Sequence, residues 1–121
     1  MIVVDASAIL AIHFNEPERE AAAGAVMSPA NYWEVLVRAR AMDGAAGEAA
    51  ADNIVAAFGV EIATIDAVMA RAAADAFARF GRRTPAALNL GDCFAYALAQ
   101  AHAAPLLFKG DDFAKTDVIA A

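Results

Sequence analysis

Short apolar runs separated by alanine-rich helical segments constrain this chain most. The runs Ile2–Val4, Ala25–Met27 and Pro105–Phe108 are too short for core helices and carry almost no polar residue. Such runs are typical of strands buried on both faces, as in a parallel sheet. Gly59–Thr64 alternates in polarity like a further strand, and Val118–Ile119 is a candidate last one. The pattern predicts an α/β fold with a parallel sheet of four to five short strands between helices.

The helical segments carry clear start and stop signals. Ser28–Pro29, Asp66 and Asn89 each precede a helical pattern as N-cap residues. Asp43–Gly44 interrupts one long pattern and predicts an αα-hairpin. The expected helices cover Ser7–Phe14, Glu18–Ala25, Ala30–Met42, Ala45–Phe58, Ala67–Phe80 and Leu90–Ala103. With 121 residues, the chain is most simply a single domain over residues 1–121.

Composition excludes several classes of protein. No apolar stretch approaches the ~20 residues of a membrane span. We expect no signal peptide, because Met1 leads straight into the first strand without a basic segment. The single cysteine, Cys93, excludes a disulfide framework and multi-thiolate metal sites. We therefore expect a cytoplasmic protein without membrane association. The net charge of −6 argues against sequence-blind coating of nucleic acid. It leaves a metal-dependent nuclease open, because two divalent cations would cancel about four negative charges.

Acidic residues follow the strands at the edge where a parallel sheet binds ligands. Asp5 ends the first apolar run, and Asp111 and Asp112 follow the last one after a Lys-Gly step. Glu34 and Asp92 lie early in two helical patterns. Ligands bind beyond the carboxyl ends of such strands, so these acids are expected to share one site. A carboxylate cluster is costly unless it is protonated, paired or bound to a cation, and hard cations prefer carboxylate oxygens.

Each acid also has a purely structural explanation. Asp5 could cap the helix that follows it. Glu34 could form a surface ion pair with Arg38, four residues on, worth only roughly 0.3–0.5 kcal/mol. Asp92 could be a first-turn acid favoured by the helix dipole, with Asn89 as its N-cap. The metal-site interpretation therefore depends on the acids jointly.

The last acids and their neighbours leave the ligand set partly open. Asp111 and Asp112 could both be turn residues, and we expect only one of them to act as a ligand. Asp117 is a further acid that could orient the ligands without binding the cation itself. Ser7 and Asn31 could position ligands or substrate by hydrogen bonds, and Asn31 shares a helix face with Glu34.

Four segments together resemble a known family. They read Val-Val-Asp-Ala-Ser-Ala at 3–8, Ser-Pro-Ala-Asn-Tyr-Trp-Glu-Val-Leu at 28–36, Leu-Gly-Asp-Cys-Phe-Ala-Tyr-Ala-Leu-Ala at 90–99 and Leu-Leu-Phe-Lys-Gly-Asp-Asp-Phe at 106–113. In this order and spacing the sequence resembles the PIN-domain family, specifically the VapC-like ribonuclease toxins. The resemblance covers essentially the whole chain.

The resemblance implies a three-layer α/β/α fold and a metal-dependent endoribonuclease that uses Mg²⁺ or Mn²⁺. It implies Asp5, Glu34, Asp92 and Asp112 as catalytic acids, with Asp111 as the alternative fourth ligand. It also implies the toxin role in a VapBC-type toxin–antitoxin pair, with inhibition of translation and growth. The partners would be a cognate antitoxin, an RNA such as transfer RNA, and a second copy in a homodimer.

Few residues suggest how RNA would be held. Basic side chains lie near the last acids or in the loop before the Asp92 helix, where they could bind phosphate or be ordinary solvated charges. Tyr32 and Trp33 fit either core packing or a partner interface. The candidate RNA contacts are Arg82, Arg83, Lys109 and Lys115.

Two other functions compete with the nuclease. A phosphoacceptor receiver could use Asp66 as acceptor and Lys109 as its lysine. A receiver needs an acidic pair after its first strand, however, whereas Asp5 is followed by Ala-Ser-Ala. A non-catalytic PIN-like scaffold is the second alternative, although all the expected acids are present.

Overall fold

The computed structural model describes residues 1–13 and 24–121. The predicted helix end at Phe14 lies outside the described residues, as does most of the helix predicted over Glu18–Ala25. Its last two positions are described: Gly24 is in a turn, and Ala25 leads directly into a strand.

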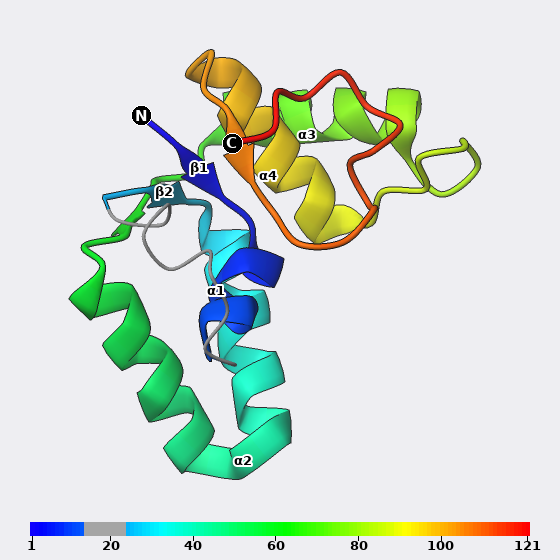
Figure 1. The fold of residues 1–121 in the computed structure, drawn as a ribbon. Coiled ribbons are helices and arrows are strands. Elements are labelled where there is room, and N and C mark those ends of the chain that lie inside the picture. The colour runs from blue at the N-terminus through cyan, green and yellow to red at the C-terminus, as the bar shows by residue number, and fades with distance from the viewer. Residues whose placement is uncertain (14–23) are drawn as a thin grey trace.

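The predicted α/β architecture is confirmed (Figure 1). Four parallel strands form one sheet in the order β3-β2-β1-β4. The strands are β1 (Val3–Val4), β2 (Val26–Met27), β3 (Glu61–Ile62) and β4 (Leu106–Leu107). The helices among the described residues are α1 (Ala6–His13), α2 (Pro29–Ala57), α3 (Ala67–Phe80) and α4 (Leu90–Ala101). The strand predicted at Val118–Ile119 is reduced to a single bridge between Ala120 and Leu106.

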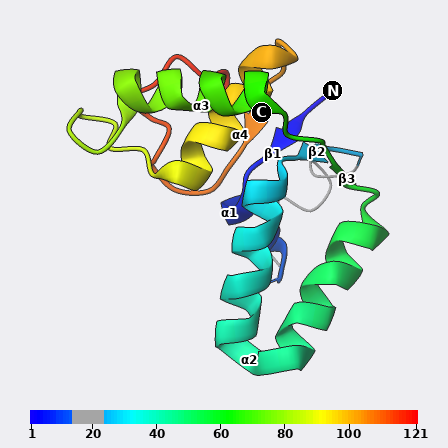
Figure 2. The same ribbon diagram turned by 180° about the vertical axis from the view of Figure 1, so that it is seen from behind.

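Consecutive strand residues face opposite layers of the molecule. Because side chains alternate along a strand, each two-residue strand supplies one side chain to each face. Val3, Val26 and Leu106 pack with α3 and α4 in one core cluster. Val4, Met27 and Leu107 pack with α1 and α2 in the other. Figures 1 and 2 show these helix pairs on either side of the sheet, which confirms the three-layer prediction.

The predicted αα-hairpin is present within α2, as two helical arms that meet at a kink. Asp43 (φ −151°, ψ 33°) and Gly44 (φ 56°, ψ −143°) leave helical geometry, and Gly44 takes the positive φ that glycine tolerates best. The two arms then run side by side (Figure 2). At Gly47 a Cβ would overlap the backbone carbonyl of Ala39, so close contact of the arms needs glycine there.

The predicted caps position the helices around the sheet edge. Ser28 caps α2 by accepting from the Asn31 N–H (3.1 Å), and Pro29 occupies the first turn. Asp66 caps α3 and Asn89 caps α4. Within residues 1–13 and 24–121, no helix combines the length and apolarity that crossing a bilayer requires.

Candidate functional site

The four predicted acids come from four different parts of the chain and lie near the carboxyl ends of β1 and β4 without converging on one point. Asp5 follows β1, Glu34 lies in α2, Asp92 lies in the first turn of α4 and Asp112 lies in the loop after β4. Asp5 and Asp92 are only 4% and 6% exposed. The acids also interact electrostatically. Burial is the main cause of the raised pKa of Asp92, and the charges of Asp5, Asp112 and Glu34 raise it further.

Ser7 connects Asp5 to the loop after β4. Its N–H and hydroxyl both donate to Asp5 Oδ2, at 3.1 and 2.6 Å. The same hydroxyl oxygen accepts the backbone N–H of Lys109 at 2.9 Å. Burial raises the pKa of Asp5 although these Ser7 hydrogen bonds oppose the rise. Ser7 therefore connects the Asp5 carboxylate to the start of the Asp111–Asp112 loop.

Asn31 is the buried hydrogen-bonding centre of the site. Its side-chain amide is fully buried and donates to Asp5 Oδ1 (3.3 Å) and to the Gly91 carbonyl (3.0 Å). Its side-chain oxygen accepts the Ser28 hydroxyl at 2.6 Å. One side chain thus joins β1, the start of α2 and the first turn of α4, and it sets their relative positions.

Asp92 is both a helix-capping residue and a member of the acid cluster. The Asn89 N–H donates to Asp92 Oδ2 (3.1 Å), and the Asp92 N–H donates to Asn89 Oδ1 (2.9 Å), which forms a capping box. Burial and the neighbouring acid charges nonetheless raise the pKa of Asp92 to about 7. Asp92 therefore caps α4 and also lies among the other acids, so its capping role does not exclude a role in the candidate site.

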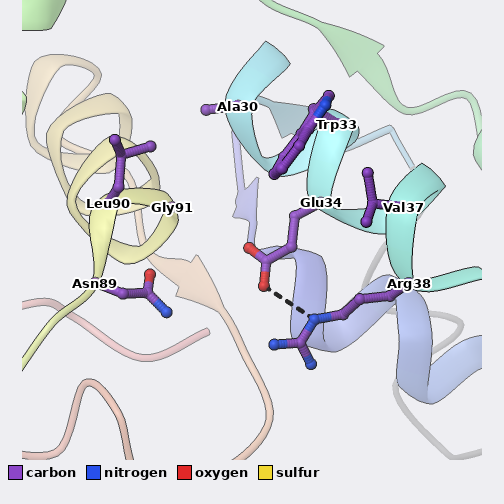
Figure 3. Close-up of a pocket in the computed structure, with 8 residues that line it drawn as sticks. All are labelled: Ala30, Trp33, Glu34, Val37, Arg38, Asn89, Leu90 and Gly91. Atoms are coloured by element: carbon purple, nitrogen blue, oxygen red, sulfur yellow. Dashed lines mark ion pairs between the residues drawn. The ribbon is translucent and has the colours of Figure 1, made fainter. Parts of the chain in front are cut away.

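Glu34 reaches from α2 toward the first turn of α4 (Figure 3). Its pKa is raised by burial and by the Asp5 charge, while the Arg38 ion pair at 3.3 Å opposes the rise. A Cβ built at Gly91 would lie 2.7 Å from Glu34 Oε1. Glycine at this position lets the Glu34 carboxylate approach α4. The sequence prediction missed Gly91, although its place directly before Asp92 was a usable signal.

Asp111 and Asp112 differ in whether their charge affects the pKa values of the other acids. Both are exposed. The charge of Asp112 contributes to the raised pKa values of Asp5, Glu34 and Asp92. In the part of the chain that the structure describes, Asp111 is not among the charges that raise them. Asp112 is therefore the better placed of the two.

Asp117 has partners away from the four acids. It accepts hydrogen bonds from the Tyr96 hydroxyl and from Arg79, the latter at 3.4 Å. The Tyr96 bond is the main reason that the pKa of Asp117 is lowered. These contacts tie the C-terminal segment to α3 and α4, so Asp117 has a structural explanation that the sequence did not suggest.

The candidate RNA contacts fall into two groups. Lys109 and Lys115 are exposed on the segment that carries Asp112. Arg82 and Arg83 are exposed after α3 and line a hollow with the exposed Phe77. The lysines are thus the closer pair along the chain to the acids.

The acids suit a divalent cation by chemistry but do not converge on one point. In residues 1–13 and 24–121, no three carboxylate, imidazole or thiolate groups are arranged to hold a metal ion. Ser7 bonds Asp5, Asn89 bonds Asp92, and Arg38 pairs with Glu34 instead. The donor oxygens are nevertheless those that Mg²⁺ and Mn²⁺ prefer, and a cation would offset the mutual repulsion of the carboxylates. Joint coordination would require these side chains to leave the partners that they have here.

Comparison with known proteins decides the family. A family model for the PIN domain matches residues 2–119. This chain belongs to the PIN-domain family. The match includes Asp5, Glu34, Asp92 and Asp112, so the four coupled acids all lie within the PIN domain.

Curated relatives of this PIN domain are named VapC ribonucleases. The chain is 41% identical to Ribonuclease VapC of Mycolicibacterium smegmatis over 127 aligned residues, covering 98% of each chain. It is 38% identical to Ribonuclease VapC42 of Mycobacterium tuberculosis, covering 97% of this chain and 96% of the relative. The predicted resemblance to VapC-like proteins is therefore confirmed.

Solved structures confirm the PIN fold independently of close sequence similarity. VapC20 of Mycobacterium tuberculosis, described as a Sarcin-Ricin loop cleaving toxin, matches with a TM-score of 0.78 at 15% identity. That match covers 100% of this chain and 98% of VapC20. A toxin–antitoxin complex from Klebsiella pneumoniae matches with a TM-score of 0.70 at 20% identity, covering 100% and 97% of the two chains.

Proposed function

We propose that this PIN domain is a metal-dependent endoribonuclease and the toxin of a VapBC-type toxin–antitoxin pair. The observation that carries the proposal is the grouping of acids from separate elements at one sheet edge, where the buried Asn31 amide joins Asp5 to Gly91 beside Asp92 and the Glu34 carboxylate lies against Gly91. Full-length relatives named VapC ribonucleases support the choice of RNA as substrate.

The proposed ligands of Mg²⁺ or Mn²⁺ are Asp5, Glu34, Asp92 and Asp112. Such a cation supplies a water nucleophile at neutral pH and stabilises the charge that develops on the phosphodiester. Asp5 is held for this task by Ser7 and Asn31. Asp92, whose pKa is raised to about 7, would release any proton it carries when the cation binds.

Cleavage of RNA by matched variants tests this proposal. The wild-type chain should cleave RNA with Mg²⁺ or Mn²⁺ and stop in EDTA, and Asp5→Asn should abolish cleavage while the circular dichroism spectrum stays unchanged. Asp66→Asn is the control, because Asp66 caps α3 and asparagine caps equally well. Metal-independent cleavage, or full activity of Asp5→Asn, would contradict the proposal.

The same variants separate the competing functions. A receiver domain would form an acyl phosphate on Asp66 with a small phosphodonor, and Asp66→Asn would remove it. The Asp66 carboxylate accepts a hydrogen bond from the Met69 N–H at 2.9 Å, so Asp66 has a capping role in the structure. A chain that binds Mn²⁺ at the four acids but cleaves no RNA would instead support the non-catalytic scaffold.

The proposed partners are a cognate antitoxin, an RNA such as transfer RNA, and a second copy of the chain. A toxin–antitoxin complex among the structural relatives supports the antitoxin. Co-expression with the product of an adjacent short reading frame should give a stable complex that lacks RNA cleavage. Light scattering should give twice the chain mass, and a single-chain mass at all concentrations would contradict the dimer.

We place this activity in the cytoplasm, in keeping with the buried, unpaired Cys93.

A further inference from the structure

A slot beside Glu34 lies between α2 and the start of α4 (Figure 3). Trp33, Glu34, Val37 and Arg38 line it from α2, and Leu90 and Gly91 lie opposite them at the start of α4. Glu34 is the lining residue that belongs to the acid cluster. Its volume of about 330 Å³ is at the lower end of the range for small-molecule sites. Two further hollows continue this surface, one sharing Trp33 and Val37 with the slot and the other sharing Leu90. Of the three hollows, the slot is the one that Glu34 lines.

The walls of this slot expose large apolar side chains. Trp33 is 65% exposed and Leu90 is 68% exposed. The alternative of core packing for Trp33 is therefore wrong, because this side chain lies at the surface. Apolar side chains that are grouped around a hollow beside polar groups mark a binding site more often than isolated exposed ones do.

The chemistry of the slot matches a nucleotide. Indole faces stack on bases of any sequence, and apolar side chains can close over the opposite face of a base. The Arg38 guanidinium, 61% exposed and 3.3 Å from Glu34, could contact a neighbouring phosphate. Glu34 belongs both to the slot and to the acid cluster, so a strand with its phosphodiester at the acids passes directly beside Trp33.

We propose that the slot binds one unpaired nucleobase of the RNA, stacked on Trp33 and covered by Leu90, next to the phosphodiester at the acid cluster. This inference rests on the proposed ribonuclease function and specifies its substrate as a strand whose base can leave its stack. Bases in a duplex are already paired and stacked, so regular double-stranded RNA should bind poorly.

Fluorescence tests the proposal directly, because Trp33 is the only tryptophan of the chain. The wild-type protein is titrated in EDTA with a single-stranded RNA oligonucleotide and with the same sequence as a duplex. Stacking predicts saturable quenching of Trp33 emission by the single strand and little change with the duplex. EDTA prevents turnover on the proposed mechanism, and a gel confirms that the RNA stays intact.

Kinetics supply the second readout. Trp33→Leu should raise KM for single-stranded RNA roughly tenfold, since one stacked base is worth about a tenfold change or more in binding. Trp33→Phe, which keeps an aromatic face, should stay near wild type. Val68→Ala is the control, because Val68 is 77% exposed on α3 and does not line the slot. Melting temperatures of all variants verify that they fold.

The outcomes separate this inference from the function on which it rests. RNA cleavage with no quenching and an unchanged KM for Trp33→Leu would overturn the base slot and leave the nuclease intact. Quenching by RNA without cleavage in Mg²⁺ or Mn²⁺ would support the slot and count against the nuclease. A protein-concentration-dependent change in Trp33 emission without RNA would show that a second copy covers the slot, and would overturn the inference. Equal losses in Trp33→Leu and Trp33→Phe would also overturn stacking.

Discussion

Replacing Asp92 with asparagine should stabilise the metal-free chain at pH 8. Asp92 is 6% exposed, and the charges of Asp5, Asp112 and Glu34 oppose its ionisation. Asparagine has the same shape and can keep a side-chain oxygen toward the Asn89 N–H, so the helix cap survives. The substitution therefore removes the cost of burying a charge, which is the main cause of the raised pKa, together with the repulsion from the other acids, at little structural loss.

The size of the effect follows from the raised pKa. The pKa of Asp92 rises from 3.8 to about 7 on folding, so the folded state binds the proton more tightly than the unfolded state. Stability is therefore present at low pH and is lost as pH rises through about 4 to 7. At about 1.4 kcal/mol per pKa unit, the upper limit at pH 8 is about 4 kcal/mol. We expect roughly half of this limit as the measured gain in the free energy of unfolding, because the asparagine amide also loses hydration when it is buried.

Thermal unfolding in EDTA measures this difference. Asp92→Asn should melt on the order of 8 °C above wild type at pH 8, at about 4 °C per kcal/mol for a chain of this size. The gap should shrink steadily as the pH falls toward 4. Asp75→Asn, an exposed change of equal charge on α3, is the control. An Asp92→Asn protein less stable than wild type at pH 8, or a gap independent of pH, would refute the electrostatic reasoning.

Three further substitutions test separate parts of the molecule. Asp112→Asn should abolish Mg²⁺-dependent RNA cleavage and Asp111→Asn should retain it, because the Asp112 charge reaches the other acids; the reverse result in a gel assay would reassign the fourth ligand. Asn31→Ala should lower the free energy of unfolding in urea by about 2–4 kcal/mol, since it leaves buried partners unsatisfied; an unchanged midpoint would contradict its central role. Gly47→Ala should cost about 1–3 kcal/mol by overlap with the Ala39 carbonyl, and a wild-type melting temperature would show that the arms of α2 separate freely.

The fold was predictable largely because β1, β2 and β4 are short and buried on both sides. Val3 and Val4 pack into different core clusters on the two faces of the sheet. Two consecutive apolar residues are therefore enough to bury both sides of this strand. The last strand was not predictable in the same way. Whether Val118–Ile119 pairs fully depends on the path of the preceding loop, and the chain makes only the Ala120 bridge to Leu106.

Sequence reasoning identified candidate side chains of the site more readily than the contributions of the backbone. Ser7 and Asn31 were identifiable from their spacing to the acids, and both hydrogen-bond to Asp5. The contributions of Gly91, through its carbonyl and its missing Cβ, leave no polar side chain to recognise.

The exposed position of Trp33 could have been inferred from helix geometry. Trp33 follows the fully buried Asn31 by two positions, which places the two side chains on roughly opposite sides of α2. The direction of the Asp117 carboxylate depends instead on the turns through residues 111–116. Turns have no helical or strand periodicity from which that direction could be inferred.

An anomalous difference map from crystals grown with Mn²⁺ tests the central claim most directly. The account predicts manganese coordinated by Asp5 and Asp92, with Asp112 and Glu34 completing the site directly or through water. Manganese bound elsewhere, or no manganese at these four carboxylates at saturating concentration, would contradict it.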